Sequence, residues 1–155
     1  LRGSSESNET ILLTAHLDSK ERRRAKPLAR VLRLAADLHL ERDQLGEALP
    51  LLIDAHQLDK TDLDTALLLG LLAIDLDRLE TAASALRVLI AQRELGTREG
   101  ARARSLNLAE GYFQLARIEY PHGKKTNAKR MALRALEEKP ERAEARALLD
   151  QIALH

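Results

Sequence analysis

The sequence predicts an all-α protein built from stacked pairs of helices, and three observations lead to this fold class. Leu, Ala, Arg and Glu are abundant among the 155 residues while aromatic side chains make up 2%, a composition that favours helices over strands. Similar residues recur at a fixed spacing of 34 positions. The segment TALLLGLLAIDL, residues 65–76, would be apolar on every side of a helix, so other helices or a partner must cover it.

Composition and charge exclude several classes of protein. With 45% hydrophobic and 32% charged residues, the chain suits one soluble domain with its own core. Residues 65–76 are too few for the roughly 20 that a membrane-spanning helix needs, so no membrane span is predicted. The net charge of +1 creates no global field that attracts nucleic acid or anionic lipid. Because the chain has no cysteine, disulfides, thiolate metal sites and cysteine nucleophiles are excluded.

The first 26 residues carry no repeat signal. Residues 1–10 are polar and we expect them to be poorly ordered, with LRGSSES resembling a vector-derived tail. A lead segment of residues 11–26 follows, and its apolar part, residues 11–17, is either a helical turn or an extended piece that packs on the first repeat.

The origin of the chain can also be predicted from its sequence. It begins with Leu rather than Met, so we expect a piece of a longer product. No stretch resembles a signal peptide, which favours the cytoplasm. The excess of Ala, Leu and Arg is typical of a GC-rich bacterial source.

Two helices are expected directly after the lead segment. Pro27 fits the first turn of a helix, where its missing N–H would have no partner, so the pattern predicts a helix from Pro27 to Arg42. The apolar residues of this helix follow the three-and-four spacing of a half-buried helix: Leu28, Val31, Leu32, Ala35, Leu38 and Leu40. A second helix is predicted from Leu45 to Gln57, with Pro50 about one turn inside it.

A repeat of 34 residues becomes visible when this pair of helices is aligned with the next. Five pairs of positions match at this spacing: Ala36 and Gly70, Asp43 and Asp77, Leu45 and Leu79, Ala48 and Ala82, Leu52 and Leu86. The small residues stand where two helix axes must approach closely, because a side chain larger than methyl would push the helices apart. Each period therefore contains two helices and a short turn.

These positions resemble the tetratricopeptide repeat (TPR) family, whose pattern has a large residue, a Leu-Gly pair and a Tyr on the first helix, then an Ala and an aromatic residue on the second. In residues 63–96 the matches are Leu69-Gly70, Ala82 and Leu86. In residues 29–62 the same slots hold Ala35-Ala36, Ala48 and Leu52, with His39 in the tyrosine slot. The slot of the first large residue departs from the family, since it holds Leu32 or Ala66.

The third repeat, residues 97–142, is longer than the first two. Ala128 occupies the small-residue slot of its second helix, and Pro140 stands where the family often has proline. Ala82 and Ala128 are 46 residues apart instead of 34. The extra residues lie in RELGTREG and in or before YPHGKKT, residues 120–126.

Two registers are open for the first helix of this third repeat. Either Leu108-Ala109 form the Leu-Gly pair with Tyr112 in the tyrosine slot, or Leu115-Ala116 form the pair with Tyr112 in the tryptophan slot. The two differ by seven residues, close to two helical turns, so both expose the same face of the helix.

A final helix is predicted for residues 143–155. Its apolar residues fall on one side: Ala145, Leu148, Leu149 and Ile152. A stack of repeats needs a terminal helix with a polar outer face, so this helix is expected to cap the array. The resemblance thus implies a right-handed superhelical stack of antiparallel helical hairpins, a TPR-like α-solenoid with three repeats and a capping helix.

Motifs for catalysis or cofactor binding do not occur in the sequence. The five histidines lack the spacing of a zinc pair, and the seven glycines form neither a phosphate-binding loop nor a dinucleotide fingerprint. The acidic residues are spread along helices close to Arg or Lys, as on solvated helix faces. We therefore expect no metal site, no cofactor and no enzymatic activity.

The resemblance also implies a binding surface, because the first helices of TPR hairpins line a concave groove. The family's groove slots carry over to three sets of residues, one in each repeat, which we call the groove positions: Arg30, Arg33, Asp37, Leu40 and Glu41; then Asp64, Leu67, Leu71, Ile74 and Asp75; then Leu106, Glu110, Phe113 and Gln114. Their apolar centre favours an amphipathic helix or apolar peptide as partner. The alternative is that neighbouring helices or the N-terminal segment cover them.

Family members that hold acidic chaperone tails use Lys and Asn in these slots, whereas this chain has Asp37 and Leu71 where asparagines would be needed. The groove positions therefore argue against an acidic tail as the ligand.

Two other modes of interaction are open. Self-association, in which the array or its ends pair with a second copy, is the main alternative to peptide binding. Nucleic-acid binding is less favoured, since single-strand binders combine cations with aromatic stacking surfaces and the aromatic residues are few. The cations it would use form a basic patch: Lys20, Arg22, Arg23, Arg24 and Lys26.

Overall fold

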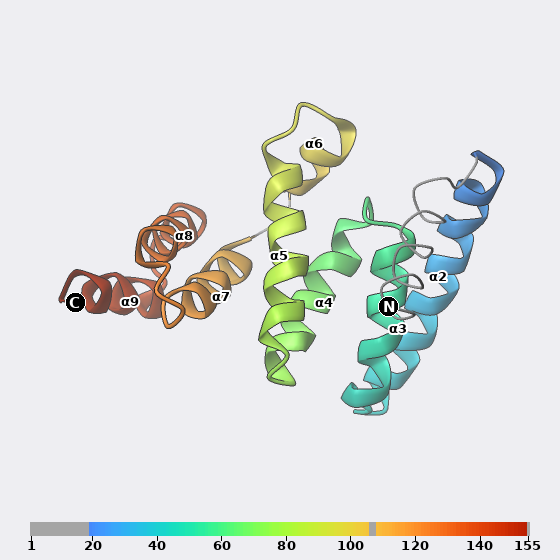
Figure 1. The fold of residues 1–155 in the computed structure, drawn as a ribbon, viewed down its shortest axis with the longest axis horizontal. Helices are drawn as coiled ribbons and strands as arrows, with labels where there is room; N and C mark the ends of the chain where they lie inside the picture. Colours follow the sequence, from blue (N-terminus) through green and yellow to red (C-terminus); the bar gives the residue numbers. More distant parts are fainter. Residues whose placement is uncertain (1–18, 106–107, 155) are drawn as a thin grey trace, which may run out of the picture.

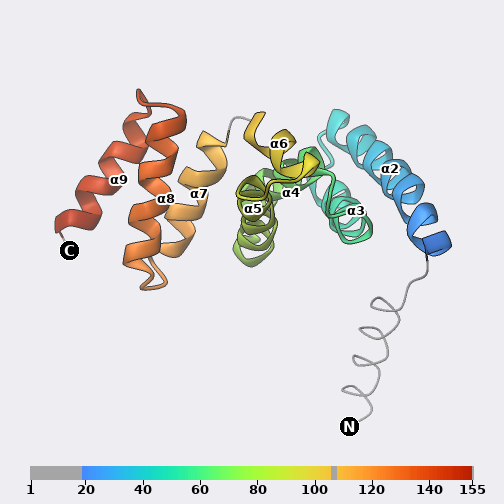
Figure 2. The same ribbon diagram turned by 90° about the horizontal axis from the view of Figure 1, so that it is seen from above.

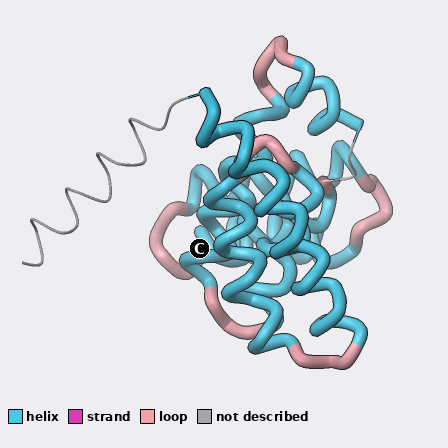
Figure 3. The backbone as a smooth tube through the Cα atoms, turned by 90° about the vertical axis from the view of Figure 1, so that its right-hand side faces the viewer, coloured by secondary structure: helices cyan, strands magenta, loops and turns pink. Residues whose placement is uncertain are grey.

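The computed structural model describes residues 19–105 and 108–154, and over these ranges the chain forms helices and no strand (Figure 1). The helices are α2 (Ser19–Glu41), α3 (Leu45–Leu58), α4 (Leu63–Asp75), α5 (Leu79–Arg93), α6 (Arg98–Ser105), α7 (Ala109–Glu119), α8 (Lys125–Glu138) and α9 (Ala143–Leu154). Apart from α6, which lies against α5 and α4, they follow one another along a single row from α2 to α9 (Figure 2). Short loops join them (Figure 3). The predicted all-α fold is confirmed. The expected tail of residues 1–10 and the helical turn or extended piece expected at residues 11–17 lie outside the described residues.

Three hairpins build the row: α2 with α3, α4 with α5, and α7 with α8. Each turns at the same repeat position, where Asp43, Asp77 and Gly123 have positive φ angles of 57°, 57° and 75°. The amide that follows each of them donates to the carbonyl five residues earlier, as in Gln44 to His39 at 2.8 Å. This is the left-handed cap that ends a helix sharply. The backbone therefore repeats where the sequence does.

The starts of the helices decide the register of the third hairpin. The helices α4 and α7 begin at Leu63 and Ala109, and their partners α5 and α8 each begin 16 residues later. Leu115-Ala116 therefore lie at the positions of Leu69-Gly70, which is the second of the two registers. All the extra residues precede α7, where α6 folds back against α5 and touches α4. The turn at residues 120–126 carries no insertion.

The helix α2 differs from the prediction at its N-terminus. A helix was expected to begin at Pro27, but α2 begins at Ser19 and continues through this proline. Proline removes one backbone donor, and the exposed residues Arg23, Arg24 and Lys26 around it are good helix formers whose carbonyls can bind water instead. The next helix, α3, spans Leu45–Leu58 with Pro50 inside it, as predicted.

The core is continuous between hairpins because small residues on one helix make room for large side chains of the neighbouring helix. Leu86 on α5 is fully buried, and a Cβ atom added at Gly70 on α4 would lie 2.8 Å from its Cδ2. A Cβ added at Gly111 on α7 would lie 3.3 Å from the same atom. Leu86 therefore fills a slot between two first helices, where Gly70 leaves no room for a Cβ atom unless Leu86 shifts and Gly111 leaves little room. Close approach of the helices at the repeat's small residues is thus observed.

We predict that Gly70→Leu lowers the free energy of unfolding by about 1 to 3 kcal/mol or more, because the new side chain collides with buried Leu86. The matched control is Gly46→Leu in the first turn of α3, where an added Cβ has nothing within 4 Å. That variant should be as stable as the parent or more so, since glycine disfavours the helix. Urea denaturation followed by circular dichroism measures both, and equal stabilities would contradict the packing.

Candidate functional site

The middle of the predicted groove lies on α4. Leu67, Leu71 and Ile74 follow one another at helical spacings of three and four residues, and all three are half-buried. Leu67 and Ile74 pack with part of their surface against the main core. Asp75 is exposed at the end of the helix. The three apolar side chains therefore form a partly open row that the fold itself does not fully cover.

On the α2 side, a polar network joins the first two hairpins. The Arg33 guanidinium binds Asp37 through Nε at 3.0 Å and donates from Nη1 to the Thr65 hydroxyl at 3.0 Å. Thr65 is buried and its own hydroxyl and amide bind the Asp62 carboxylate, which caps α4. Arg33 is thus held in place before any ligand arrives. Of the other groove positions on α2, Arg30 is exposed and Leu40 half-buried.

On the α7 side, a cation covers the aromatic ring. Phe113 is buried, and the guanidinium carbon of Arg142, just before α9, lies 4.3 Å from its ring centroid. Arg142 is fixed there by Glu110, whose Oε2 lies 2.5 Å from its Nη1. Gln114 donates to the other carboxylate oxygen of Glu110 at 2.6 Å. At this end of the predicted groove, polar side chains therefore cover Phe113, and its ring is not open to a ligand.

The charge of Glu110 is stabilised in this arrangement. Burial alone would raise its pKa, but the hydrogen bonds from Gln114 and Arg142 and the positive charges of Arg142 and Arg117 outweigh burial. The pKa of Glu110 is therefore lowered from its ordinary value of 4.5. The carboxylate stays ionised at neutral pH and keeps Arg142 over the ring.

The remaining predicted residues are scattered or lie outside the described part. Leu106 falls in the gap of residues 106–107, and the side chains of Lys20 and Arg22 are likewise outside the description. Arg23, Arg24 and Lys26 are exposed near the start of α2. The groove positions on α2, α4 and α7 come from neighbouring hairpins, whereas the basic patch lies on one helix end only.

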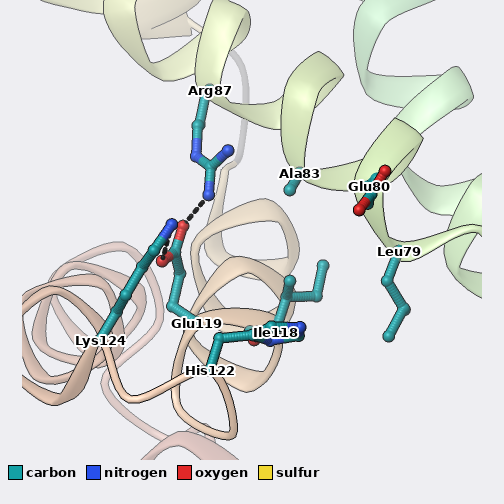
Figure 4. A pocket seen from close by; sticks show the side chains of 8 residues that line it. All are labelled: Leu79, Glu80, Ala83, Arg87, Ile118, Glu119, His122 and Lys124. Carbon is teal, nitrogen blue, oxygen red and sulfur yellow. Dashed lines mark hydrogen bonds and ion pairs between the residues drawn. The ribbon is translucent and has the colours of Figure 1, made fainter.

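A cavity of about 360 Å³ lies between α5 and the turn from α7 to α8 (Figure 4). At its wall the buried carboxylate of Glu119 binds the Arg87 guanidinium from α5, and Lys124 Nζ lies 3.4 Å from its second oxygen. Burial would raise the pKa of Glu119, but the hydrogen bonds and charges of Arg87 and then Lys124 outweigh it and lower the pKa. Sequence reasoning missed this carboxylate, which occupies the family's tyrosine slot on α7.

The apolar face of α2 is the feature that differs most from expectation. Three residues of the predicted apolar set are more than half exposed, namely Leu28, Val31 and Leu38, and so is Leu34, which the predicted set did not include. Leu32 and Ala35 are half-buried. A sequence pattern does not reveal whether a neighbouring helix is present to cover an apolar stripe.

Two further properties concern only the described residues. Within residues 19–105 and 108–154, no three His, Cys, Asp or Glu side chains gather closely enough to hold a metal ion. Over the same ranges no helix combines the length and apolar character that crossing a membrane requires.

The hairpins, repeated turns and glycine slots define a helical-repeat solenoid. Comparison with solved structures places the chain among TPR folds. It matches the Arabidopsis OM64 TPR domain over 84% of this chain and 98% of that one, with a TM-score of 0.61 and 11% identity. It matches the first TPR of Spaghetti (RPAP3) bound to the HSP90 peptide SRMEEVD over 83% and 93%, with a TM-score of 0.59 and 18% identity.

A third similar structure is the first TPR domain of human RPAP3, which has a TM-score of 0.55 at 19% identity over 82% of this chain and 91% of that one. No family model and no curated protein sequence matches the chain. The protein therefore has the fold of a TPR domain, as its sequence pattern predicts.

We predict that Glu119 makes the stability of the fold depend on acid pH. Its pKa is lower in the folded chain than in the unfolded one, so the ionised carboxylate stabilises the fold above about pH 4.5. This contribution is lost as the pH falls through the folded pKa. Glu119→Gln should therefore melt at a lower temperature at pH 7 and lose less stability on acidification than the parent.

The control for this experiment is Glu141→Gln, which changes an exposed carboxylate and should follow the parent at every pH. Thermal melts between pH 7 and pH 3 measure all three proteins. Parallel curves for Glu119→Gln and the parent would show that the Glu119 carboxylate does not stabilise the fold.

Proposed function

We propose that this chain is a non-catalytic protein-interaction module that holds an amphipathic helix or an apolar peptide against α4. The observation that carries the proposal is the half-buried row of Leu67, Leu71 and Ile74 on the first helix of the central hairpin. A ligand that covered this row would remove apolar surface from water, which is the main favourable term in such association. The TPR fold supports the proposal, since a similar domain of RPAP3 has been solved with a peptide bound.

The polar groups on both sides of the row support a ligand with an apolar centre and polar flanks. On α2 the Arg33–Asp37 pair reaches α4 through the Thr65 hydroxyl. On the other side α7, which contacts α4, carries the network of Glu110, Gln114 and Arg117. These groups already satisfy one another in the free protein. Because their charges are already paired, these groups are suited to orienting a bound ligand. They are less suited to attracting a ligand of strong net charge.

Binding of an acidic peptide such as SRMEEVD is not supported by the same positions. Such a ligand needs cations and amide donors that are free to reach its carboxylates. Here Arg33 is occupied by Asp37 and Thr65, and Leu71 is apolar. Among the described residues, the centre of the predicted groove is apolar, whereas an acidic ligand would need hydrogen-bond donors there.

We predict that Leu71→Glu weakens binding of the partner at least tenfold, because a charge would be buried against its apolar side. The control is Leu133→Glu, which places the same charge at an exposed leucine on α8, the second helix of its hairpin. Phe113 is a poor probe, because replacing a buried ring would also destabilise the fold.

The measurement has two stages. Proteins captured from a lysate by the parent chain and by each variant are first compared by mass spectrometry, and synthetic peptides from the captured protein are then titrated against all three chains. Thermal melts confirm that each variant is folded. Equal affinity of the parent and Leu71→Glu for the same peptide would place the binding surface elsewhere and overturn the proposal.

A further inference from the structure

The exposed face of α2 has the arrangement of a helix-pairing surface. Leu28, Val31, Ala35 and Leu38 recur at alternating spacings of three and four residues, and Leu34 lies beside them. Leu28, Val31, Leu34 and Leu38 are 51%, 60%, 64% and 54% exposed. Four large apolar side chains in one stripe exceed the scattered apolar residues of an ordinary surface.

The other first helices show what kind of element covers this face. On α9, the residues at the repeat positions of Val31, Leu34 and Leu38 are Ala145, Leu148 and Ile152, which are 0%, 9% and 1% exposed. They are covered because α9 packs against α8, the second helix of the preceding hairpin. On α4, Thr65 and Leu72 occupy two of the same positions, and both are buried where α4 packs against α3. The occupant that fits the face of α2 is therefore a helix.

We propose that this occupant is the α2 helix of a second copy of the chain, packed antiparallel across a two-fold axis. The charges beside the stripe support this orientation. Arg23 and Arg30 lie along the same flank as Leu34, as do Asp37 and Glu41 further along the helix, because these positions differ by about whole turns. The flank is thus basic in its first half and acidic in its second.

Antiparallel pairing brings these halves together. With the two-fold axis near the middle of the stripe, Arg23 of one copy lies opposite Glu41 of the other, and Arg30 lies opposite Asp37. The Asp37 side chain is 40% exposed although it binds Arg33, so its carboxylate can also face a second copy. In a parallel two-fold pair the two copies of this flank would lie on opposite edges of the interface, so their basic and acidic halves would not meet.

Another occupant, the outer side of α9 in a second copy, fits the face less well. The outer side of α9 presents the exposed polar residues Arg146, Asp150 and Gln151, so a head-to-tail contact would bury charges against leucines.

The mass of the full 155-residue chain in solution tests this pairing. At tens of micromolar, light scattering coupled to size exclusion should give about twice the monomer mass of 17.3 kDa. The double variant Val31→Glu, Leu34→Glu should run as a monomer and keep the parent's helical content, because both side chains are exposed in the single chain. Leu133→Glu, which changes an exposed leucine on α8, should remain dimeric. A monomeric parent chain, or a double variant that stays dimeric, overturns the proposal.

Charge exchange tests the antiparallel orientation separately. Arg23→Glu and Glu41→Arg should each weaken the dimer several-fold, and the two together should restore it, since each then faces its opposite again. The chain has no cysteine, so Leu34→Cys provides one thiol close to the axis. It should form a disulfide-linked dimer on mild oxidation, whereas Leu133→Cys should not. Failure of the charge rescue and of the Leu34→Cys cross-link overturns the orientation.

The dimer flank shares Arg30, Asp37 and Glu41 with the predicted groove positions, so the two proposals are separated by variants outside this shared set. Leu71→Glu changes α4 and should leave the dimer intact, whereas the Val31→Glu, Leu34→Glu variant should bind the α4 ligand as the parent does. Failure of one proposal is therefore distinguishable from failure of the other.

Discussion

The slot filled by Leu86 is the constraint on which the rest of the structure depends. This fully buried side chain on α5 meets Gly70 on α4 within its own hairpin and Gly111 on α7 in the next. A helical hairpin alone cannot bury its apolar face, so stability must come from contacts between neighbours. One leucine that serves both its own hairpin and the next couples them, and the two glycines set how closely the helices approach.

Much of the fold could be predicted because its repeated contacts leave a repeated sequence. The turn residues Asp43 and Asp77 recur at the period of the hairpins, since each must adopt the same left-handed conformation. The helix α6 and the continuation of α2 through Pro27 could not be predicted this way. Each is used once in the chain, so no second copy of the pattern marks it, and local propensity alone decides between helix and loop at such sites.

The candidate site was predicted less completely than the fold, for a physical reason. The groove slots, among them Leu67, Leu71 and Ile74, follow from the position on a helix that the resemblance implies, and these three side chains are half-buried. Whether a slot is open depends on side chains that approach from distant parts of the chain. Arg142 reaches Phe113 from the start of α9 and is held there by Glu110, a contact that no spacing within α7 encodes. Glu119 shows the same limit, because its partner Arg87 comes from another hairpin.

The two ends of the described array have opposite character, and this difference bears on how copies of the chain can meet. The helix α9 buries its apolar side against α8 and turns Arg146 and Asp150 outward, so this end resists further stacking. The helix α2 buries one side against α3 and leaves Val31 and Leu34 in water. If both ends were apolar, copies could stack head to tail without limit. With one apolar end, the proposed contact joins like with like, and such a contact closes after two copies.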